Sequence, residues 1–141
     1  MELRIYTGGT FDLFHAGHAL FLKKCSQLGK VTVSLNTDDF IKQYKGKAPV
    51  CNDQERFLVM KSCKYVSEVI WNSGGVDSKP SILRTKPDII AIGSDWARKD
   101  YYKQMMFDQD WLDVNGISLI YIPYTRGISS TDIKTRIWTY S

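Results

Sequence analysis

Apolar residues along the chain gather in short segments of four to six positions, separated by longer stretches in which apolar and polar residues mix. Segments of that length, bounded by polar or turn-forming residues, are typical of strands. The strongest is Asp88–Gly93, whose four central residues are all apolar, as in a parallel strand that is buried on both faces. The pattern predicts five strands: Leu3–Tyr6, Val31–Leu35, Val66–Trp71, Asp88–Gly93 and Ile117–Ile122.

The mixed stretches between these segments predict helices, and some carry end signals. Asp53 can cap the first turn of one helix, and Gly116 stands where a helix C-cap is expected. The segment Lys42–Asn52 is basic and indicates an irregular loop. The helices are expected at Gly17–Leu28, from Asp53 onward, at Pro80–Thr85, at Asp100–Asn115 and at Ser129–Trp138.

Strands that alternate with helices predict parallel pairing through right-handed crossovers. The sequence shows no internal repeat and no linker. We therefore expect one α/β domain over residues 1–141, a Rossmann-like five-stranded parallel sheet with helices on both faces. Ligands of such sheets bind beyond the carboxyl ends of the strands. The loops expected to share one cleft are Gly8–His18, Asn36–Asp53, Gly93–Trp96 and Tyr124–Thr131.

Composition and charge narrow the possible partners. The chain is 43% hydrophobic and 24% charged, which is ordinary for a globular protein and excludes disorder. Its net charge is +4, and the window Lys42–Lys64, with six basic and two acidic residues, carries a net +4 by itself. Because the excess positive charge is local, we expect the partner to be a compact anion, and not a nucleic acid.

The cysteine pattern and the hydropathy indicate in which cellular compartment the protein is expected. Cys25, Cys51 and Cys63 are odd in number and far apart, so neither a zinc ribbon nor a disulfide framework is expected. The chain starts directly with a strand-like segment, and no apolar run approaches the roughly 20 residues of a membrane span. We expect a cytoplasmic protein with reduced thiols, no protein-bound metal and no membrane partner.

Candidate chemistry begins in the loop Thr7–Asp12, which leads to the only two histidines, His15 and His18. Glycines after a strand let a phosphate approach the backbone, and a following helix N-terminus offers unpaired N–H groups. The loop lacks a Walker or full dinucleotide motif, so a simple tight turn is the alternative. Small residues between the histidines let both imidazoles face one ligand. Anion contact is favoured over metal binding, for which further ligands are missing nearby, and over a capping or packing role.

Three motifs carry a resemblance to a known family. The segment Gly9–His18 resembles the GTFDxxHxGH signature of the nucleotidyltransferase α/β phosphodiesterase superfamily, and Thr125–Lys134 resembles its GIS[ST]T signature followed by a helix. Gly93–Trp96 stands where members of that superfamily carry GxDW. The motifs occur in the expected order over essentially the whole chain, and the chain is most similar to glycerol-3-phosphate cytidylyltransferases.

The resemblance implies a single cytidylyltransferase-like catalytic domain over residues 1–141, acting as a homodimer. It also implies a reaction in which CTP, with Mg²⁺, and a phosphorylated small alcohol give a CDP conjugate and pyrophosphate. Glycerol 3-phosphate is the first choice of acceptor. A phosphate monoester has a second pKa of about 6. The acceptor phosphate, which is the nucleophile, is therefore already an anion and needs no general base. The protein must align two polyanions and stabilise charge on the departing pyrophosphate.

The resemblance also assigns site residues. In the transition state, the two histidines would donate hydrogen bonds to triphosphate oxygens. The expected catalytic residues are His15, His18, Lys47 and Arg126. The expected nucleotide-binding residues are Gly9, Thr10, Phe11, Arg56, Asp95, Trp96, Gly127, Ile128, Ser129, Ser130 and Thr131, and the expected acceptor-binding residues are Lys45 and Lys79.

Each of these assignments has a plainer alternative. The two lysines that flank Gly46 can be solvated surface charges, and Arg56 can form a surface salt bridge with Asp53 or Glu55. Trp96 can be a packing residue at a strand end. The hydroxyl residues Ser129–Thr131 can form an N-cap, which is compatible with phosphate binding because both use the same unpaired N–H groups.

Some positions depart from the family pattern. Tyr124 occupies the place of an expected arginine, and Arg126 follows two positions later. The segment Ala97–Gly116 is longer than in compact relatives, and Lys79 lies only near the expected lysine. These departures leave the acceptor open, with ethanolamine, ribitol or heptose phosphate as alternatives, and ATP as an alternative to CTP. A non-catalytic nucleotide-binding module is the competing class, and a small nucleic-acid binder is disfavoured by the charge map.

Overall fold

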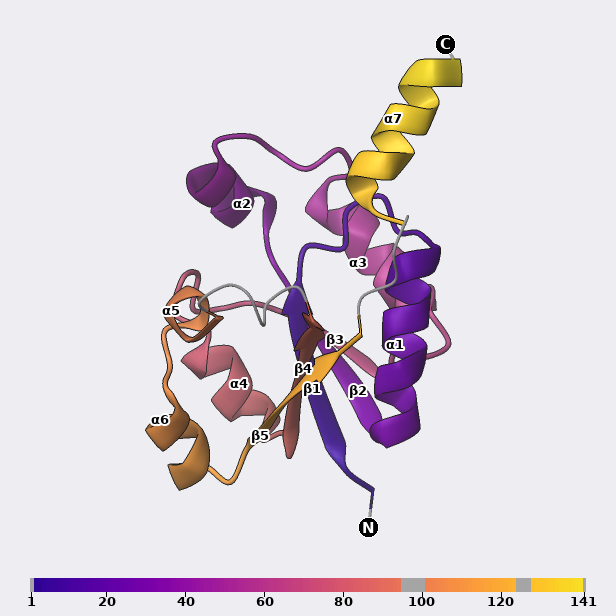
Figure 1. Ribbon diagram of the computed structural model, residues 1–141. Coiled ribbons are helices and arrows are strands. Elements are labelled where there is room, and N and C mark those ends of the chain that lie inside the picture. Colours follow the sequence, from indigo (N-terminus) through magenta and orange to yellow (C-terminus); the bar gives the residue numbers. More distant parts are fainter. Residues whose placement is uncertain (1, 95–100, 124–127, 141) are drawn as a thin grey trace.

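The computed structural model describes residues 2–94, 101–123 and 128–140, and in them five strands form one sheet (Figure 1). The strand order is β3-β2-β1-β4-β5, and all neighbouring strands pair in parallel. This confirms the predicted five-stranded parallel sheet. The strands are β1 (Arg4–Gly9), β2 (Lys30–Leu35), β3 (Glu68–Trp71), β4 (Ile89–Gly93) and β5 (Ser118–Ile122).

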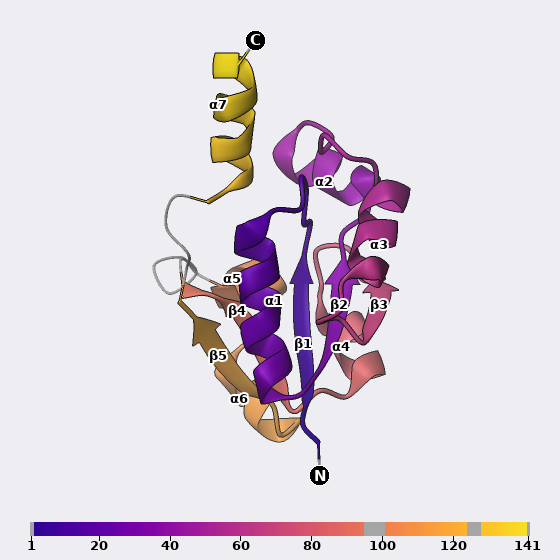
Figure 2. The same cartoon turned by 90° about the vertical axis from the view of Figure 1, so that its right-hand side faces the viewer.

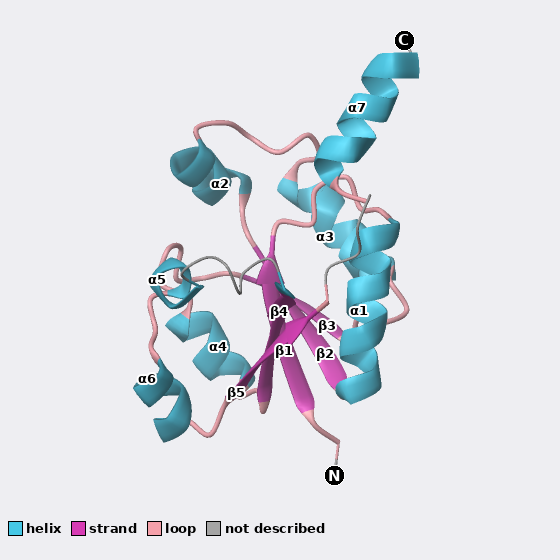
Figure 3. Cartoon of the chain, viewed as in Figure 1, coloured by secondary structure: helices cyan, strands magenta, loops and turns pink. Residues whose placement is uncertain are grey.

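Helices cover both faces of the sheet, as predicted (Figures 1 and 3). One face carries α1 (Ala16–Leu28) and α3 (Asp53–Ser62), and the other carries α4 (Lys79–Thr85), α5 (Tyr101–Met105) and α6 (Gln109–Val114). The remaining helices, α2 (Asp38–Lys45) and α7 (Ser130–Tyr140), lie beyond the carboxyl ends of the strands, and α7 extends away from the body of the molecule (Figure 2).

Alternation along β1 sends its side chains into two separate cores. Ile5 packs with Leu22 of α1 and Met60 of α3 on one face, whereas Tyr6 packs with Ile82 of α4 and Leu112 of α6 on the other. All six side chains are at most 1% exposed. Because successive strand residues point to opposite faces, the carboxyl end of β1 can also serve ligands on both sides of the sheet.

Helix α2 was not predicted. The segment after β2 was expected to be a loop that becomes basic and irregular from Lys42, yet a helix spans Asp38–Lys45. Thr37 caps it by accepting a hydrogen bond from the backbone N–H of Phe40, and Gly46 ends it with a φ of 80°. The expectation of an irregular loop is therefore wrong up to Lys45, which is the last residue of the helix.

The predicted helix Asp100–Asn115 is also wrong as a single element. Two short helices, α5 and α6, occupy the part that the structure describes. The chain breaks between them at Met106, which adopts a φ of 60°, and Asp108 then caps α6 by accepting a hydrogen bond from the N–H of Trp111 at 2.8 Å. A left-handed residue cannot continue a right-handed helix, so the chain turns at this point.

Candidate active site

The two histidines lie at the start of α1 and stack on each other. Their ring centroids are 3.8 Å apart, with an angle of 20° between the ring planes. His15 is the N-cap residue, and its Nδ1 accepts a hydrogen bond from the backbone N–H of Gly17 at 3.0 Å. The Nδ1 of His18 accepts in turn from the backbone N–H of His15 at 3.3 Å. The pair thus forms a capping box built from imidazoles.

This arrangement fixes the protonation state of both rings. Burial lowers the pKa of His15, helped by Arg136, and burial together with His15 lowers the pKa of His18 to about 4. Both imidazoles are therefore neutral at pH 7. Since each Nδ1 accepts a backbone hydrogen bond, each neutral ring carries its proton on Nε2. The two rings offer a pair of Nε2–H donors.

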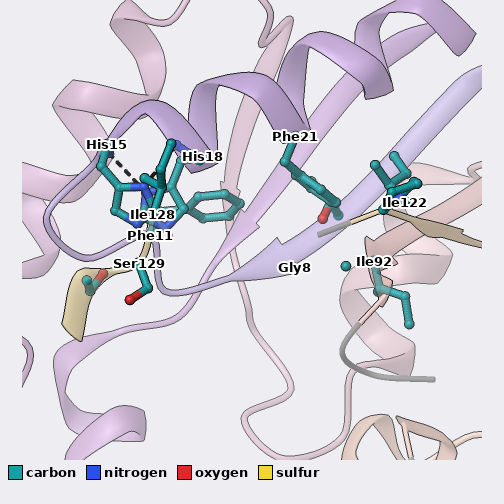
Figure 4. A pocket seen from close by; sticks show the side chains of 14 residues that line it. Gly8, Phe11, His15, His18, Phe21, Ile92, Ile122, Ile128 and Ser129 are labelled. Carbon is teal, nitrogen blue, oxygen red and sulfur yellow. Dashed lines mark hydrogen bonds between the residues drawn. The ribbon is translucent and has the colours of Figure 1, made fainter. Parts of the chain in front are cut away.

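A cavity of about 310 Å³ opens beside the histidines (Figure 4). Its wall joins the first loop and α1 to the ends of β4 and β5 and to the segment that begins α7. Figure 4 shows His15, His18 and Phe11 close to Ile128 and Ser129, which come from the opposite end of the sequence. The lining residues are Thr7, Gly8, Phe11, His15, Gly17, His18, Phe21, Ile92, Gly93, Ile122, Pro123, Ile128, Ser129 and Ser130.

Gly17 is required for this close approach. A Cβ atom at this position would lie 2.9 Å from Cε1 of His15 and 3.2 Å from the backbone oxygen of Ile128. A larger residue would therefore separate the histidine pair from the segment before α7. At the start of that helix, the Ser129 hydroxyl accepts a hydrogen bond from the N–H of Asp132 at 3.0 Å, as expected for an N-cap.

Asp12 holds the first loop in place. Its carboxylate accepts hydrogen bonds from the backbone N–H groups of Leu13, Val50 and Cys51 at 2.8–3.0 Å. Its backbone oxygen accepts a hydrogen bond from the Ser130 hydroxyl at 2.8 Å. Three distant parts of the chain therefore meet at one aspartate.

The loop is also strained, because Phe11 and Leu13 adopt φ values of 52° and 50°. Non-glycine residues in the left-handed region cost free energy and persist where the surroundings fix them. The hydrogen bonds of Asp12, which lies between the two, supply this restraint.

Arg56 is buried inside the protein and does not line the cavity. The residue is 2% exposed, and its guanidinium donates to the backbone oxygens of Cys51 at 3.1 Å and of Thr10 and Asn36 at 2.9 Å each. It also forms an ion pair with Asp38 at 2.8 Å. The alternative of a surface salt bridge with Asp53 or Glu55 is wrong. In this position Arg56 clamps the loops that follow β1 and β2, and direct contact with a triphosphate stays a prediction.

A second cavity, of about 410 Å³, lies on the other face of β1. It shares Gly8 with the first cavity, so the two meet at the carboxyl end of that strand. Its floor comes from β1, β2 and the segment after β3, and its walls come from α2 and α5. The lining residues are Tyr6, Gly8, Gly9, Thr10, Ser34, Asn36, Phe40, Ile41, Tyr44, Lys45, Asn72, Gly75, Val76, Ser78, Gln104 and Met105.

The predicted site residues therefore divide into groups. Phe11, both histidines and Ile128–Ser130 lie together on the first cavity, and Gly9, Thr10 and Lys45 line the second. Lys47 and Thr131 are exposed and line neither cavity. Lys79 is paired with Asp77 at 3.0 Å and also donates to the backbone oxygen of Met106, and it lines neither cavity. Asp95, Trp96, Arg126 and Gly127 lie outside the described residues.

Sequence reasoning missed several residues that line the second cavity. The sequence pattern places Ser34 in an ordinary strand, and Phe40, Tyr44 and Gln104 belong to no recognisable motif. The capping signals of α2 were present in the sequence and would have placed the two aromatic residues on one helix, four positions apart.

Comparison with known proteins identifies the family. A family model described as cytidylyltransferase-like matches residues 6–136. The chain belongs to the cytidylyltransferase-like family. Glycerol-3-phosphate cytidylyltransferase from Bacillus subtilis (strain 168) is 34% identical over 136 residues, which cover 95% of this chain and 96% of the relative. The corresponding protein from Staphylococcus aureus is 30% identical over 137 residues, 96% of this chain and 95% of the relative.

A second group of relatives of this cytidylyltransferase-like protein carries a different name. FAD synthase from Pyrococcus horikoshii is 39% identical over 95 residues, which cover 67% of this chain and 64% of the relative. The chain thus spans less than two thirds of the FAD synthase. The family and the whole-length relatives show that the protein is a nucleotidyltransferase enzyme.

Solved structures confirm the fold of the cytidylyltransferase-like chain. The lipopolysaccharide core biosynthesis protein from Thermoplasma volcanium superposes with a TM-score of 0.70 at 25% identity, covering 89% of this chain and 98% of that protein. Pantoate-β-alanine ligase from Francisella tularensis superposes with a TM-score of 0.60 at 16% identity, covering 99% of this chain and 70% of that protein. The second likeness shows the fold alone. In the described part of the chain, every helix is too short or too polar to cross a bilayer.

Proposed function

We propose that this nucleotidyltransferase transfers CMP from CTP to the phosphate of a phosphorylated small alcohol, with glycerol 3-phosphate as the first choice, and releases pyrophosphate. The observation that carries the proposal is the stacked, neutral histidine pair at the edge of the first cavity. Two Nε2–H donors at one point suit the oxygens of a triphosphate. The segment Ile128–Ser130, placed against them at the start of α7, adds backbone N–H donors.

The chemistry asks for charge stabilisation and alignment. The acceptor phosphate is already an anion near neutral pH, so no side chain has to remove a proton from it. His15 and His18 would donate to oxygens on which charge develops as pyrophosphate departs, and the capping hydrogen bonds hold both rings in place beforehand. Lys45 lines the second cavity and would hold the acceptor phosphate, and Thr10, which lines the same cavity beside Gly8, would hold the α-phosphate of the nucleotide. Lys47 and Arg126 are proposed to neutralise the triphosphate.

Mg²⁺ would enter with the triphosphate. Within the described ranges, no group of three or more histidine, cysteine, aspartate or glutamate side chains is placed to hold a metal ion. The carboxylate of Asp12 is already occupied by three backbone N–H groups. Mg²⁺ commonly binds through substrate phosphates and water with few protein ligands, which fits this set. Its contribution would be to neutralise phosphate charge.

Coverage favours a glycerol-type acceptor. The glycerol-3-phosphate cytidylyltransferases match this chain over nearly its whole length and theirs, including the segments that carry α2, α5 and α7. The FAD synthase similarity supports a second candidate, transfer of AMP from ATP to a flavin phosphate. That similarity extends over 95 residues.

A pyrophosphate-release assay tests the proposal. The enzyme is supplied with each of the four ribonucleoside triphosphates, paired in turn with glycerol 3-phosphate, ribitol 5-phosphate, phosphoethanolamine and FMN. Release with CTP and glycerol 3-phosphate supports the proposal, and release with ATP and FMN alone would support the second candidate. Tight nucleotide binding without release in any pair would identify a non-catalytic module.

His18→Ala separates catalysis from affinity. If the imidazole acts on the transition state, kcat should fall by about 100-fold or more while the Kd for CTP changes by less than about tenfold. A loss confined to the Kd would contradict the proposed role. A matched control is Ser26→Ala, on the same helix, whose hydroxyl bonds only the backbone oxygen of Lys23.

We also propose that the protein is a homodimer and that α7 takes part in its interface. This helix has no buried residue, and Ile137 and Trp138 are 60% and 83% exposed. An isolated helix of 11 residues is marginal in water, so one that extends from the body needs a packing partner. Sedimentation should give a dimer for the native chain and a monomer for Ile137→Glu, whereas a native monomer would contradict the proposal.

A further inference from the structure

The first residue after each of three neighbouring strands carries a hydrogen-bonding side chain. These residues are Thr10 after β1, Asn36 after β2 and Asn72 after β3. The strand ends stand in register, and the backbone ladder continues one bond beyond them. The N–H of Asn36 donates to the oxygen of Gly9 at 3.0 Å. The N–H of Asn72 donates to the oxygen of Leu35 at 2.9 Å. The three side chains therefore form a row at the carboxyl edge of the sheet, where all of them line the second cavity.

A backbone carbonyl fixes the direction of the hydrogen bonds in this row. Nδ2 of Asn72 donates to the backbone oxygen of Gly75 at 2.9 Å, and a carbonyl oxygen can only accept. The same amide nitrogen donates to Oδ1 of Asn36 at 3.2 Å, and Oδ1 of Asn72 accepts from the Ser81 hydroxyl at 3.2 Å. Since Oδ1 of Asn36 is occupied by a donor, its Nδ2 faces the Thr10 hydroxyl oxygen, 3.5 Å away. Every link therefore donates in the same direction, from α4 toward the end of β1.

Both ends of the row are held in place. Ser81 is fully buried, and its hydroxyl oxygen accepts a hydrogen bond from the backbone N–H of Ser73 at 2.9 Å. At the other end, the guanidinium of Arg56 donates to the backbone oxygens of Thr10 and Asn36 at 2.9 Å each. With the backbone fixed at these points, the orientation of the two amides decides what the row presents to the cavity.

The row determines what the Thr10 hydroxyl can do. Its oxygen accepts from Asn36, and none of the described residues accepts its proton. The link is long and therefore weak, but it places a donor on one side of the oxygen and leaves the proton to a group in the cavity. The oxygens of a nucleoside triphosphate only accept, and hydrogen bonds to charged groups are strong. A reversed amide at Asn36 would instead accept the proton of Thr10 and turn it away from a phosphate.

We propose that Asn36 and Asn72 are positioning residues of this nucleotidyltransferase. They act through Thr10, whose hydroxyl they hold as a donor toward a phosphate oxygen at the carboxyl end of β1. The role rests on the proposed function for the identity of that phosphate, the α-phosphate of the nucleotide, whereas the orientation of Thr10 stands on the hydrogen bonds of the row. Both asparagines lie outside the motifs that carry the family resemblance.

Asn72→Asp tests the role by reversing the row while Thr10 and Asn36 stay unaltered. Aspartate has nearly the shape of asparagine and still accepts from Ser81, but its carboxylate cannot donate to Asn36. The Asn36 amide then turns its Nδ2 to the carboxylate and its Oδ1 to Thr10, whose proton is lost to the phosphate. We expect kcat/KM for CTP to fall by about 10- to 100-fold, the range for one hydrogen bond to a charged group.

Thr10→Val separates this reorientation from the added charge and from any loosening of the loop. Valine replaces the hydroxyl by a methyl group, so this variant should lose about 10- to 100-fold in kcat/KM by itself. Adding Asn72→Asp to Thr10→Val should lower kcat/KM by less than about threefold more, because no hydroxyl is left to turn. Charge or loop damage would act equally in both backgrounds. Thr10→Ser keeps the hydroxyl and should retain both the native kcat/KM and the native response to Asn72→Asp.

Asn115→Asp is the matched control. Nδ2 of Asn115 donates to the backbone oxygen of Trp111 at 2.8 Å, and the residue lines neither cavity. The variant makes the same chemical change and loses one amide–carbonyl hydrogen bond, so kcat/KM should stay within about twofold of the native value. If the Asn72→Asp chain does not fold, Asn36→Asp enters the same cycle, because its carboxylate accepts directly from Thr10 while Asn72 still donates to it.

The Kd for CTP and for ATP, measured by calorimetry in each variant, distinguishes a failure of the positioning role from a failure of the proposed function. A loss of affinity on Asn72→Asp that disappears in Thr10→Val, without pyrophosphate release from any substrate pair, would refute the transferase function and support the positioning role. Pyrophosphate release with equal losses in both backgrounds, in kcat/KM and in Kd, would support the function and overturn the positioning role. Unchanged values of kcat/KM and Kd in Asn72→Asp would overturn it as well.

Discussion

Acidification is expected to destabilise the fold through His18. Burial and the neighbouring His15 lower its pKa from 6.5 to about 4, against an opposite effect of Asp12. In the unfolded chain the same imidazole titrates near 6.5, so between these two pH values the unfolded state binds more protons than the folded state. The stability gained by keeping His18 neutral is therefore complete above pH 6.5 and is lost as the pH falls toward 4.

The size of the effect follows from the two pKa values. At pH 5 the unfolded imidazole is almost fully protonated while the folded one is mostly neutral, which lowers the free energy of unfolding by about 2 kcal/mol. At pH 4 the loss reaches about 3 kcal/mol. Against a total stability of about 5–15 kcal/mol for a typical domain, a loss of this size is readily measured.

The assay is urea unfolding at pH 7 and pH 5 for the native chain and for His18→Gln. Glutamine does not titrate, and at the third position of a capping box it can still accept the N–H of His15. All carboxylates are common to both proteins and cancel in the comparison. The native chain should lose about 2 kcal/mol more than the variant between the two pH values. Parallel losses would refute the reasoning that His18 is kept neutral by the fold.

Three further predictions concern the frame of the site. Arg56→Leu should lower the free energy of unfolding by about 3–5 kcal/mol in urea titrations, because it removes a buried cation and leaves Asp38 without its ion-pair partner. A loss below about 1 kcal/mol, which is typical of a solvent-exposed ion pair, would contradict the burial of Arg56. Asp12→Asn should cost about 2 kcal/mol in the same titration, because the carboxylate accepts three backbone N–H groups. Gly8→Ala should keep its Tm, since, apart from its two chain neighbours, no described residue has an atom closer than 3.7 Å to the added Cβ. The added methyl should nevertheless raise the acceptor KM about tenfold by narrowing the second cavity, and an unchanged KM would argue against an acceptor there.

Much of the architecture could be predicted from the sequence because local pattern and tertiary environment agree. The central residues of β4 are apolar on both faces, and the structure buries all of them. The histidine spacing predicted two rings directed at one place, and the rings stack at the start of α1. Ser129 was expected at a helix start, where its hydroxyl accepts from Asp132. For the histidines and Ser129 the deciding interactions lie within a few residues of one another.

What could not be predicted depends on partners far along the chain. The role of Arg56 is set by Thr10, which is 46 residues away, and by Asn36, which is 20 residues away. The break at Met106 has no glycine or proline to announce it, because the left-handed turn is imposed by the packing of α5 and α6.

Gly8 has a consequence for the order of events. The two cavities meet at this residue and approach it from opposite faces of the sheet. A nucleotide in one and an acceptor in the other would bring the attacking oxygen and the departing pyrophosphate to opposite sides of one phosphorus atom, which is the geometry of a single in-line displacement. Both substrates must then be bound before any product leaves, so initial rates should follow sequential and not ping-pong kinetics. A phosphorus made chiral by isotopic substitution should invert its configuration once.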